Sequence, residues 1–243
     1  MTEPGRPAGG THWPAYYEVT ADRPAWETTR VAIARFAEED AVAAAAGGPP
    51  RAEPRLALDL GCGAGRDTRE LLRHGWRVVA VDREPQAIVR LRAVTPASDL
   101  ARLSTSVEDI GEALVAPCDL VNANLSLPFL DAAGWAHAWA QIRGAVRPGG
   151  RIATMLFGDR DAKFSPEMTC PPEAEIRALL DVFEIELWAE LEEDGTTALG
   201  EPHHFHRFDI VARRPGGSAR RGPKPPTRPP TPPPTRPRGT PRG

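Results

Sequence analysis

The chain has 243 residues, with 30 Lys or Arg against 33 Asp or Glu and a formal net charge of −3 at pH 7. This length is ample for one well-buried core. Every long apolar stretch is broken by charge or proline, which predicts a soluble protein with no membrane span.

The charge is unevenly distributed along the chain. The segment from Arg213 to Gly243 holds nine Lys or Arg, eleven Pro and no acidic residue, which leaves 21 basic against 33 acidic residues before it. The body therefore carries a net charge of −12, and small-molecule partners are favoured over nucleic acid. We predict a flexible N-terminus over residues 1–12, one domain over 13–213, and a disordered Pro/Arg-rich tail over 214–243. The tail is either a solvated extension or an arm for an acidic partner.

The start of the chain and the cysteines predict where the protein resides. The first residues lack the basic start and apolar stretch of a secretory signal. The three cysteines are odd in number and have no metal-ligand spacing, so we expect a reducing, cytoplasmic environment and no metal site. Cys62 lies within a glycine turn, where its small side chain is expected to pack rather than react.

An aromatic cluster precedes the first expected long helix. Trp13, Tyr16 and Tyr17 come before a partly amphipathic helix over residues 25–46, which Gly47, Gly48 and the two prolines after them end. The cluster is either a lid over a ligand or ordinary packing against the core.

A glycine-rich turn follows a short apolar strand. Residues 56–60 read as a buried parallel strand, and glycine recurs at three alternate positions, Gly61, Gly63 and Gly65. Such a turn lets bare backbone approach a ligand and then exposes the first N–H groups of a helix. The pattern predicts a nucleotide-cofactor loop.

The next elements complete a βαβ unit. Residues 67–74 predict a short helix that Gly75 ends, and residues 77–81 predict a strand that stops at Asp82. An acid at this strand end is placed to accept hydrogen bonds from ribose hydroxyls. The third glycine falls one residue too early for the dinucleotide fingerprint, which argues against NAD.

The remaining elements alternate along the chain. We expect strands over residues 103–107 and 118–123, a turn at 146–152 into a fifth strand, a helix over 172–180, and strands over 183–191 and 205–212. Residues 192–195 are expected to form an acidic turn. The last two strands predict an antiparallel hairpin at the end of the domain.

These motifs together resemble the class I S-adenosylmethionine-dependent methyltransferases. The resemblance covers roughly residues 56–157 and implies an α/β fold: a Rossmann-like, seven-stranded sheet with helices on both faces and an antiparallel C-terminal hairpin. It implies S-adenosyl-L-methionine as cofactor. The positions that match the cofactor-binding motifs are Asp59, Gly61, Cys62, Gly63, Gly65, Asp82, Arg83, Asp109, Ile110 and Asn122.

The chain lacks the motifs of two classes of methyltransferase, which limits the kinds of methyl acceptor that we expect. Residues 122–129 do not match the Asn-Pro-Pro-aromatic motif of enzymes that methylate nucleic-acid amino groups, and Cys118 lies at the wrong end of its strand for a cytosine C5 enzyme. The pattern most resembles small bacterial methyltransferases of the tellurite-resistance-like group. We expect in-line methyl transfer to a small molecule, with a non-catalytic scaffold or an RNA methyltransferase that uses the basic tail as alternatives.

Three residues are candidates for a catalytic role, namely Tyr17, Asn124 and His206. His206 belongs to a triplet with His203 and His204, and strand alternation places His204 and His206 on one face. Two imidazoles without a third ligand are weak grounds for a metal site, so a general-base or structural role is favoured.

Overall fold

The computed structural model describes residues 13–113, 116–163, 165 and 167–216. The predicted flexible N-terminus and residues 217–243 of the predicted tail lie outside the described residues. Within the described part of the chain, no helix has the length and apolar character needed to cross a bilayer.

Seven strands form one mixed sheet in the order β3-β2-β1-β4-β5-β7-β6. The first five strands in the chain are parallel, and β7 runs antiparallel to both β5 and β6. The strands are β1 (Leu56–Leu60), β2 (Arg77–Asp82), β3 (Leu103–Val107), β4 (Cys118–Asn124), β5 (Val146–Phe157), β6 (Glu184–Thr196) and β7 (Pro202–Arg213). The predicted sheet and its antiparallel C-terminal hairpin are confirmed.

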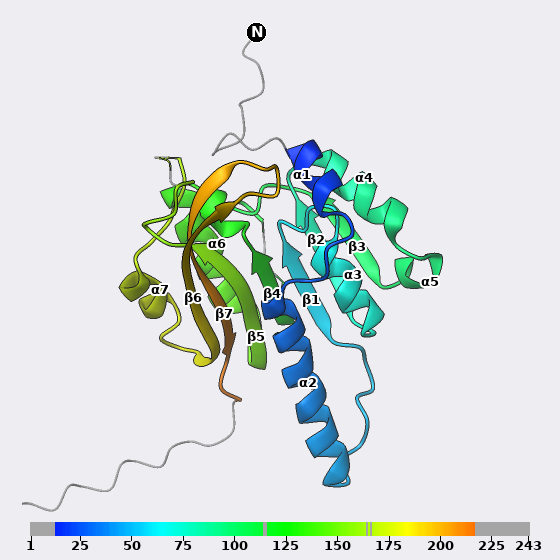
Figure 1. Cartoon of the computed structure of the whole chain (residues 1–243). Coiled ribbons are helices and arrows are strands. Elements are labelled where there is room, and N and C mark those ends of the chain that lie inside the picture. Colours follow the sequence, from blue (N-terminus) through cyan, green and yellow to red (C-terminus); the bar gives the residue numbers. More distant parts are fainter. Residues whose placement is uncertain (1–12, 114–115, 164, 166, 217–243) are drawn as a thin grey trace, which may run out of the picture.

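Helices cover both faces of this sheet, as the sequence predicts (Figure 1). They are α1 (Trp13–Thr20), α2 (Glu27–Ala45), α3 (Arg66–Arg73), α4 (Pro85–Val94), α5 (Ala97–Leu100), the 3-10 turn η2 (Leu127–Phe129), α6 (Ala132–Ala145) and α7 (Glu173–Leu179). The expected helices over residues 25–46, 67–74 and 172–180 therefore form with ends shifted by one or two residues.

Strand alternation divides the core between the two faces. On one face, small side chains such as Ala57 and Ala80 pack beneath α2, α3 and α4, together with Phe36 and Leu91. On the other face, β1 presents Leu58 and Leu60 to α6 and α7, where Trp139 and Ile176 are buried. Because both faces are covered, β1 reads as an almost continuous apolar run, which is typical of a buried parallel strand.

The strand order reverses between β1 and β4. Strands β2 and β3 lie on one side of this point and β5 on the other, so the loops after β1 and β4 diverge. In open parallel sheets, ligands bind in the crevice that this divergence leaves at the carboxyl ends of the strands. The glycine turn follows β1 at this edge.

The expected acidic turn at residues 192–195 is wrong. These residues continue β6, which pairs with β7 as far as Thr196 opposite Pro202, and the chain reverses after them through Gly200 with φ 88°. The acids are tolerated in a strand because cations oppose them: Asp194 contacts His204 at 2.7 Å, and Glu192 contacts Arg160 at 2.7 Å. The hairpin is therefore longer than predicted, and the histidine triplet lies inside β7.

Candidate functional site

The glycine turn after β1 is fastened to the end of β2. Gly61, Gly63 and Gly65 all have positive φ, at 73°, 52° and 87°. The N–H groups of Gly61 and Cys62 both donate to the carbonyl of Val81, at 2.8 and 3.0 Å. This left-handed backbone is open to glycine at little cost, and it brings the turn against the neighbouring strand.

Asp82 closes the same turn from the end of β2. One carboxylate oxygen accepts from the N–H of Gly63 and the other from the N–H of Glu84, at 2.8 and 2.9 Å. Burial raises the pKa of Asp82, and the two backbone hydrogen bonds oppose that shift. A carboxylate oxygen has two acceptor positions, so each oxygen of Asp82 retains capacity for a ligand hydroxyl.

Residues after β3 form the wall next to Asp82. The Asp109 carboxylate accepts from the N–H of Gly111 at 2.8 Å, which fixes the turn that carries it, and Ile110 offers a buried apolar side chain. Arg83 lines the same cavity from the end of β2. An apolar side chain beside a held carboxylate suits a flat ring that carries an amino group.

A buried polar network lies beneath the turn. The Asn122 amide donates to Asp59 at 2.9 Å and to Asp67 at 3.2 Å, and Asn124 donates to Asp67 at 2.8 Å. Two hydroxyls from the start of α2 complete it, with Thr28 donating to Asn124 and Thr29 to Asn122. The network joins β1, α3, β4 and α2, so it sets the position of the turn relative to the end of β4.

Asp59 is the most perturbed acid of this network. Burial, and after it the nearby Asp67 carboxylate, raise the pKa of its carboxyl to about 7, against the opposing effect of hydrogen bonds from Thr68 and Asn122. In the structure both of its oxygens accept, Oδ2 from the Thr68 hydroxyl and Oδ1 from the Asn122 amide.

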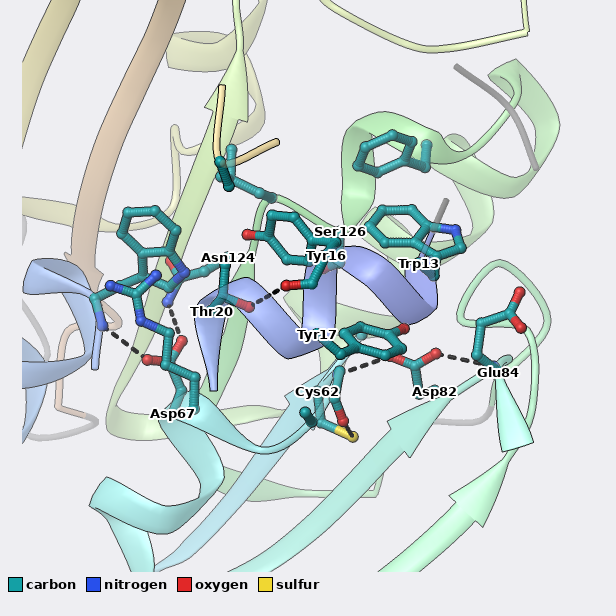
Figure 2. Close-up of a pocket in the computed structure, with 18 of the residues that line it drawn as sticks. Trp13, Tyr16, Tyr17, Thr20, Cys62, Asp67, Asp82, Glu84, Asn124 and Ser126 are labelled. Atoms are coloured by element: carbon teal, nitrogen blue, oxygen red, sulfur yellow. Dashed lines mark hydrogen bonds between the residues drawn. The ribbon is translucent and has the colours of Figure 1, made fainter. Parts of the chain in front are cut away.

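One cavity of about 590 Å³ opens above these residues. Helix α1 crosses it, with Tyr17 over Asp82 and Cys62 and Tyr16 on the side of Asn124 (Figure 2). A Cβ placed on Gly63 would lie 3.2 Å from the Tyr17 ring. Burial raises the pKa of both tyrosines, so both hydroxyls stay protonated at neutral pH.

Aromatic contacts hold α1 in this position. The Trp13 ring meets the Phe129 ring edge to face, with centroids 5.1 Å apart. The helix therefore packs and also roofs the cavity, so both interpretations of the aromatic cluster find support. Movement of α1 as a lid stays a prediction.

The far side of the cavity is built from β7, the hairpin turn and the loop after β5. Its lining residues there include two cations, an acid, an imidazole and an apolar ring: Lys163, Arg207, Glu201, His203 and Phe205. The cavity is thus divided into a side formed by the glycine turn and Asp82, and a side formed by the hairpin.

His206 lies outside this cavity lining. Its side chain is fully buried, its Nδ1 accepts from the N–H of Arg160 at 3.1 Å, and its Nε2 is 3.1 Å from Glu190. The choice of His206 as a candidate catalytic residue, which rested on its side of the strand, is therefore corrected. The side of β7 that lines the cavity carries His203 instead.

Glu190, Glu192 and His206 bring one ligand atom each within 4.8 Å of one another, a spacing that could hold a metal ion. The guanidinium of Arg160 already bonds to both carboxylates, at 3.0 and 2.7 Å, and lies 3.0 Å from the imidazole. An arginine thus provides the positive charge that this cluster needs, which gives the group a structural explanation.

The structure gathers most of the predicted site residues around the cavity. Among the cofactor candidates, the lining includes Asp59, Gly61, Cys62, Gly63, Asp82, Arg83, Asp109 and Ile110, and among the catalytic candidates it includes Tyr17 and Asn124. Gly65 packs against Leu91 behind the turn, and Asn122 is fully buried in the polar network. Burial raises the pKa of the Cys62 thiol well above its usual range, which agrees with a packing role.

Some residues that organise the site were not predicted from the sequence. Asp67 accepts from the N–H of Trp26 at 2.8 Å and joins the start of α2 to the network. The Trp26 ring stacks under the guanidinium of Arg66, 3.8 Å from the ring centroid. Arg66 and Asp67 directly follow the last glycine of the turn. An acidic residue in the first turn of a helix was therefore the sequence signal that could have identified Asp67.

Comparison with known proteins is consistent with this geometry. Residues 57–150 match a family model described as a methyltransferase domain. The methyltransferase ptaI of Pestalotiopsis fici is 31% identical over 143 residues, which is 55% of this chain and 40% of that protein. The chain therefore spans well under half the length of this relative.

Solved structures share the fold. TehB from Haemophilus influenzae superposes with a TM-score of 0.57 at 21% identity, covering 72% of this chain and 62% of TehB. The 1,6-didemethyltoxoflavin-N1-methyltransferase of Burkholderia thailandensis, with bound 1,6-didemethyltoxoflavin and S-adenosylhomocysteine, gives 0.55 at 20% identity and covers 88% and 93% of the two chains. At such identities the likeness shows the fold alone.

Proposed function

We propose that the chain is a class I S-adenosylmethionine-dependent methyltransferase, which transfers the methyl group of S-adenosylmethionine to a small-molecule acceptor by in-line displacement; the methyltransferase-domain match over residues 57–150 and the shared fold support this. The observation that carries the proposal is the junction of the glycine turn with Asp82. There, bare backbone and a carboxylate with spare acceptor capacity face the same cavity.

The residues present fit this cofactor. Asp82 would accept the ribose hydroxyls, Asp109 and Ile110 would hold the adenine, and the backbone around Gly61 and Gly63 would receive the methionine part. S-adenosylmethionine supplies an activated methyl group on a positively charged sulfur.

The protein's own contribution is alignment and the exclusion of water. Methyl transfer neutralises the positive charge on sulfur, so positioning of the two reactants supplies most of the rate. The rings of Tyr16, Tyr17 and Trp13 roof the cavity and keep it apolar above the turn. Loss of water from this space also prevents hydrolysis.

A small acceptor is supported by the shape and charge of the molecule. The cavity lies between α1 and the β6–β7 hairpin, and the body before Arg213 carries a net charge of −12. A polyanion would be repelled by this body. The Burkholderia enzyme of the same fold has 1,6-didemethyltoxoflavin bound, which is consistent with a small-molecule substrate here. A cytoplasmic location and the narrower tellurite-resistance-like grouping stay predictions.

The role of Asp82 is tested by calorimetric titration with S-adenosylhomocysteine. We expect Asp82→Asn to weaken binding by about 1.5–3 kcal/mol, roughly 10- to 150-fold, because charge-assisted hydrogen bonds to the ribose are lost. Glu173→Gln is the control, because Glu173 is exposed on α7 and pairs with Arg177. Equal affinities of the two variants would contradict the ribose assignment.

A further inference from the structure

His203 stands at the cavity wall with a buried carboxylate directly behind it. It projects from the cavity-lining side of β7, and its Nε2 lies 2.9 Å from Oδ1 of Asp161, whose side chain is fully buried. We propose that His203, oriented by Asp161, is the general base that removes a proton from an O–H or N–H nucleophile of the acceptor. The inference rests on the proposed function and deepens it.

The contacts of Asp161 determine which nitrogen of His203 carries the hydrogen. Oδ1 accepts from the N–H of Lys163 at 2.9 Å, and Oδ2 accepts from the N–H of His206 at 3.0 Å. Both oxygens of Asp161 therefore accept from backbone donors, and a carboxylate can only accept. The hydrogen of a neutral His203 must therefore sit on Nε2, and its Nδ1 must carry a lone pair.

That lone pair is available to a ligand. Among the described residues, no hydrogen bond to Nδ1 of His203 is found, whereas both ring nitrogens of the neighbouring His206 have partners. A histidine that lines a cavity and is oriented by a buried carboxylate through one ring nitrogen, with no described partner on the other, has the arrangement of a general base.

The surroundings define the acceptor that would meet this base. The centroids of the Phe205 and His203 rings are 4.5 Å apart, and the Phe129 ring forms a further apolar wall of the same cavity. Asp161 contacts His203 from behind, and the charged residues on the same side of the cavity lining are Lys163, Glu201 and Arg207. We infer a planar aromatic or heteroaromatic acceptor with a protonated hydroxyl or ring N–H.

The Lys163 ammonium would stabilise the anionic character that grows on such an acceptor. It lies 5.7 Å from the Phe129 ring centroid, and no ion pair of Lys163 is found within the described part of the chain. Burial lowers its pKa, as expected for an ammonium that is poorly solvated. The ammonium stands over the Phe129 ring in the lining that also contains His203, and the Asp161 and Glu201 carboxylates act on it electrostatically.

The step balances without a further reactant. The nucleophile's electron pair forms the bond to the methyl carbon, its proton moves to Nδ1 of His203, and the carbon–sulfur bond breaks with its electron pair going to sulfur. The products are the methylated acceptor, a neutral thioether and an imidazolium whose Nε2–H faces Asp161. The ion pair with Asp161 stabilises that imidazolium.

The tautomer is the first test, and it needs no acceptor. In the full chain labelled with 15N-histidine, the signals missing from His203→Gln identify His203 among the six histidines. We expect its neutral form to carry hydrogen on Nε2 and an unprotonated Nδ1. The opposite tautomer, or an equal mixture, would overturn the proposal.

Kinetics with two probe acceptors provide the second test. With phenol, which is protonated at neutral pH, His203→Gln should lower kcat by about 100-fold or more with little change in KM, and should remove the acid limb of the pH profile. With 4-nitrophenol, which ionises readily, the change should be less than about threefold, because no base is needed.

His204→Gln is the matched control, since His204 is the next residue of β7 but pairs with Asp194 on the opposite side of the strand. It should behave as the native protein with both probes. Equal losses with both probes in His203→Gln, or methylation of neither probe by a protein that binds S-adenosylhomocysteine, would overturn the base assignment. Failure to bind S-adenosylhomocysteine would instead contradict the proposed function.

Discussion

Gly61 and Gly65 are required by side chains of the same chain as well as by a ligand. A Cβ on Gly61 would lie 2.3 Å from the Cβ of Ser126, and one on Gly65 would lie 2.2 Å from Leu91. Both residues also have positive φ, which L side chains rarely adopt. The turn therefore fits closely between Ser126, which follows β4, and Leu91 of α4, so contacts within the chain set its shape.

Asp59 gives the turn a pH dependence. Its folded pKa of about 7 exceeds the unfolded value near 3.8, so the folded state holds a proton that the unfolded chain releases. The stabilisation from this proton is complete below about pH 4 and is lost as the pH rises through about 7.

Chemical denaturation across this range tests the prediction. The free energy of unfolding of the native chain, minus that of Asp59→Asn, should fall steadily between about pH 4 and pH 7. Taking the difference removes the titrations that the two proteins share. A difference that stays flat or rises would show that Asp59 remains ionised beneath the turn.

Site residues that belong to a sequence motif could be predicted from the sequence. Site residues that reach the cavity through long-range packing could not. The motif brought Gly61, Gly63, Asp82 and Ile110 correctly to one cavity. For the histidines, alternation separated His203 from its neighbours, but the side of β7 that faces the cavity depends on where the loop after β5 folds, a long-range contact with no local signal.

At the scale of elements, α2 is joined to the sheet by a buried arginine. The Arg151 side chain on β5 is 2% exposed and bonds to Glu39 of α2 and to Glu186 of β6, each at 2.7 Å. Its guanidinium also lies 4.3 Å from the Phe36 ring centroid. Three elements thus depend on one cation.

Arg151→Met should lower the free energy of unfolding by about 2–4 kcal/mol, since it leaves two carboxylates without their partner at a largely buried site. This loss of stability is smaller than the loss for a fully buried ion pair, because Glu39 is partly exposed and keeps its ion pair with Arg213. Arg35→Met, which breaks the exposed pair with Glu38, should change it by less than about 1 kcal/mol. Similar losses in the two variants, measured by denaturant unfolding, would show that the buried pairs contribute nothing special.

Elements with a strong local pattern were predicted closely, and the hairpin was not. Strand β3 has the expected bounds, since it is a compact run between polar segments. The acidic residues within 192–195 suggested a turn, because an acidic side chain that has no partner is unfavourable in a strand. The structure supplies Arg160 and the histidines of β7 as partners, and no single-segment pattern contains that information.

At the scale of the whole molecule, the reversal of strand order and the roof of α1 place one cavity at the carboxyl edge of the sheet. The cavity lining has a side formed by the glycine turn and Asp82 and a side formed by the hairpin. Two adjoining sides are what a reaction between a nucleotide cofactor and a small acceptor requires, because both reactants must be held together away from water.

Calorimetric titration of the full chain with S-adenosylhomocysteine, with NAD as the comparison ligand, tests this account most directly. We predict saturable one-to-one binding of S-adenosylhomocysteine and no binding of NAD, because Arg66 occupies the position where the dinucleotide fingerprint has its third glycine. Binding of NAD alone, or of neither compound, would contradict the assignment of the cavity to S-adenosylmethionine.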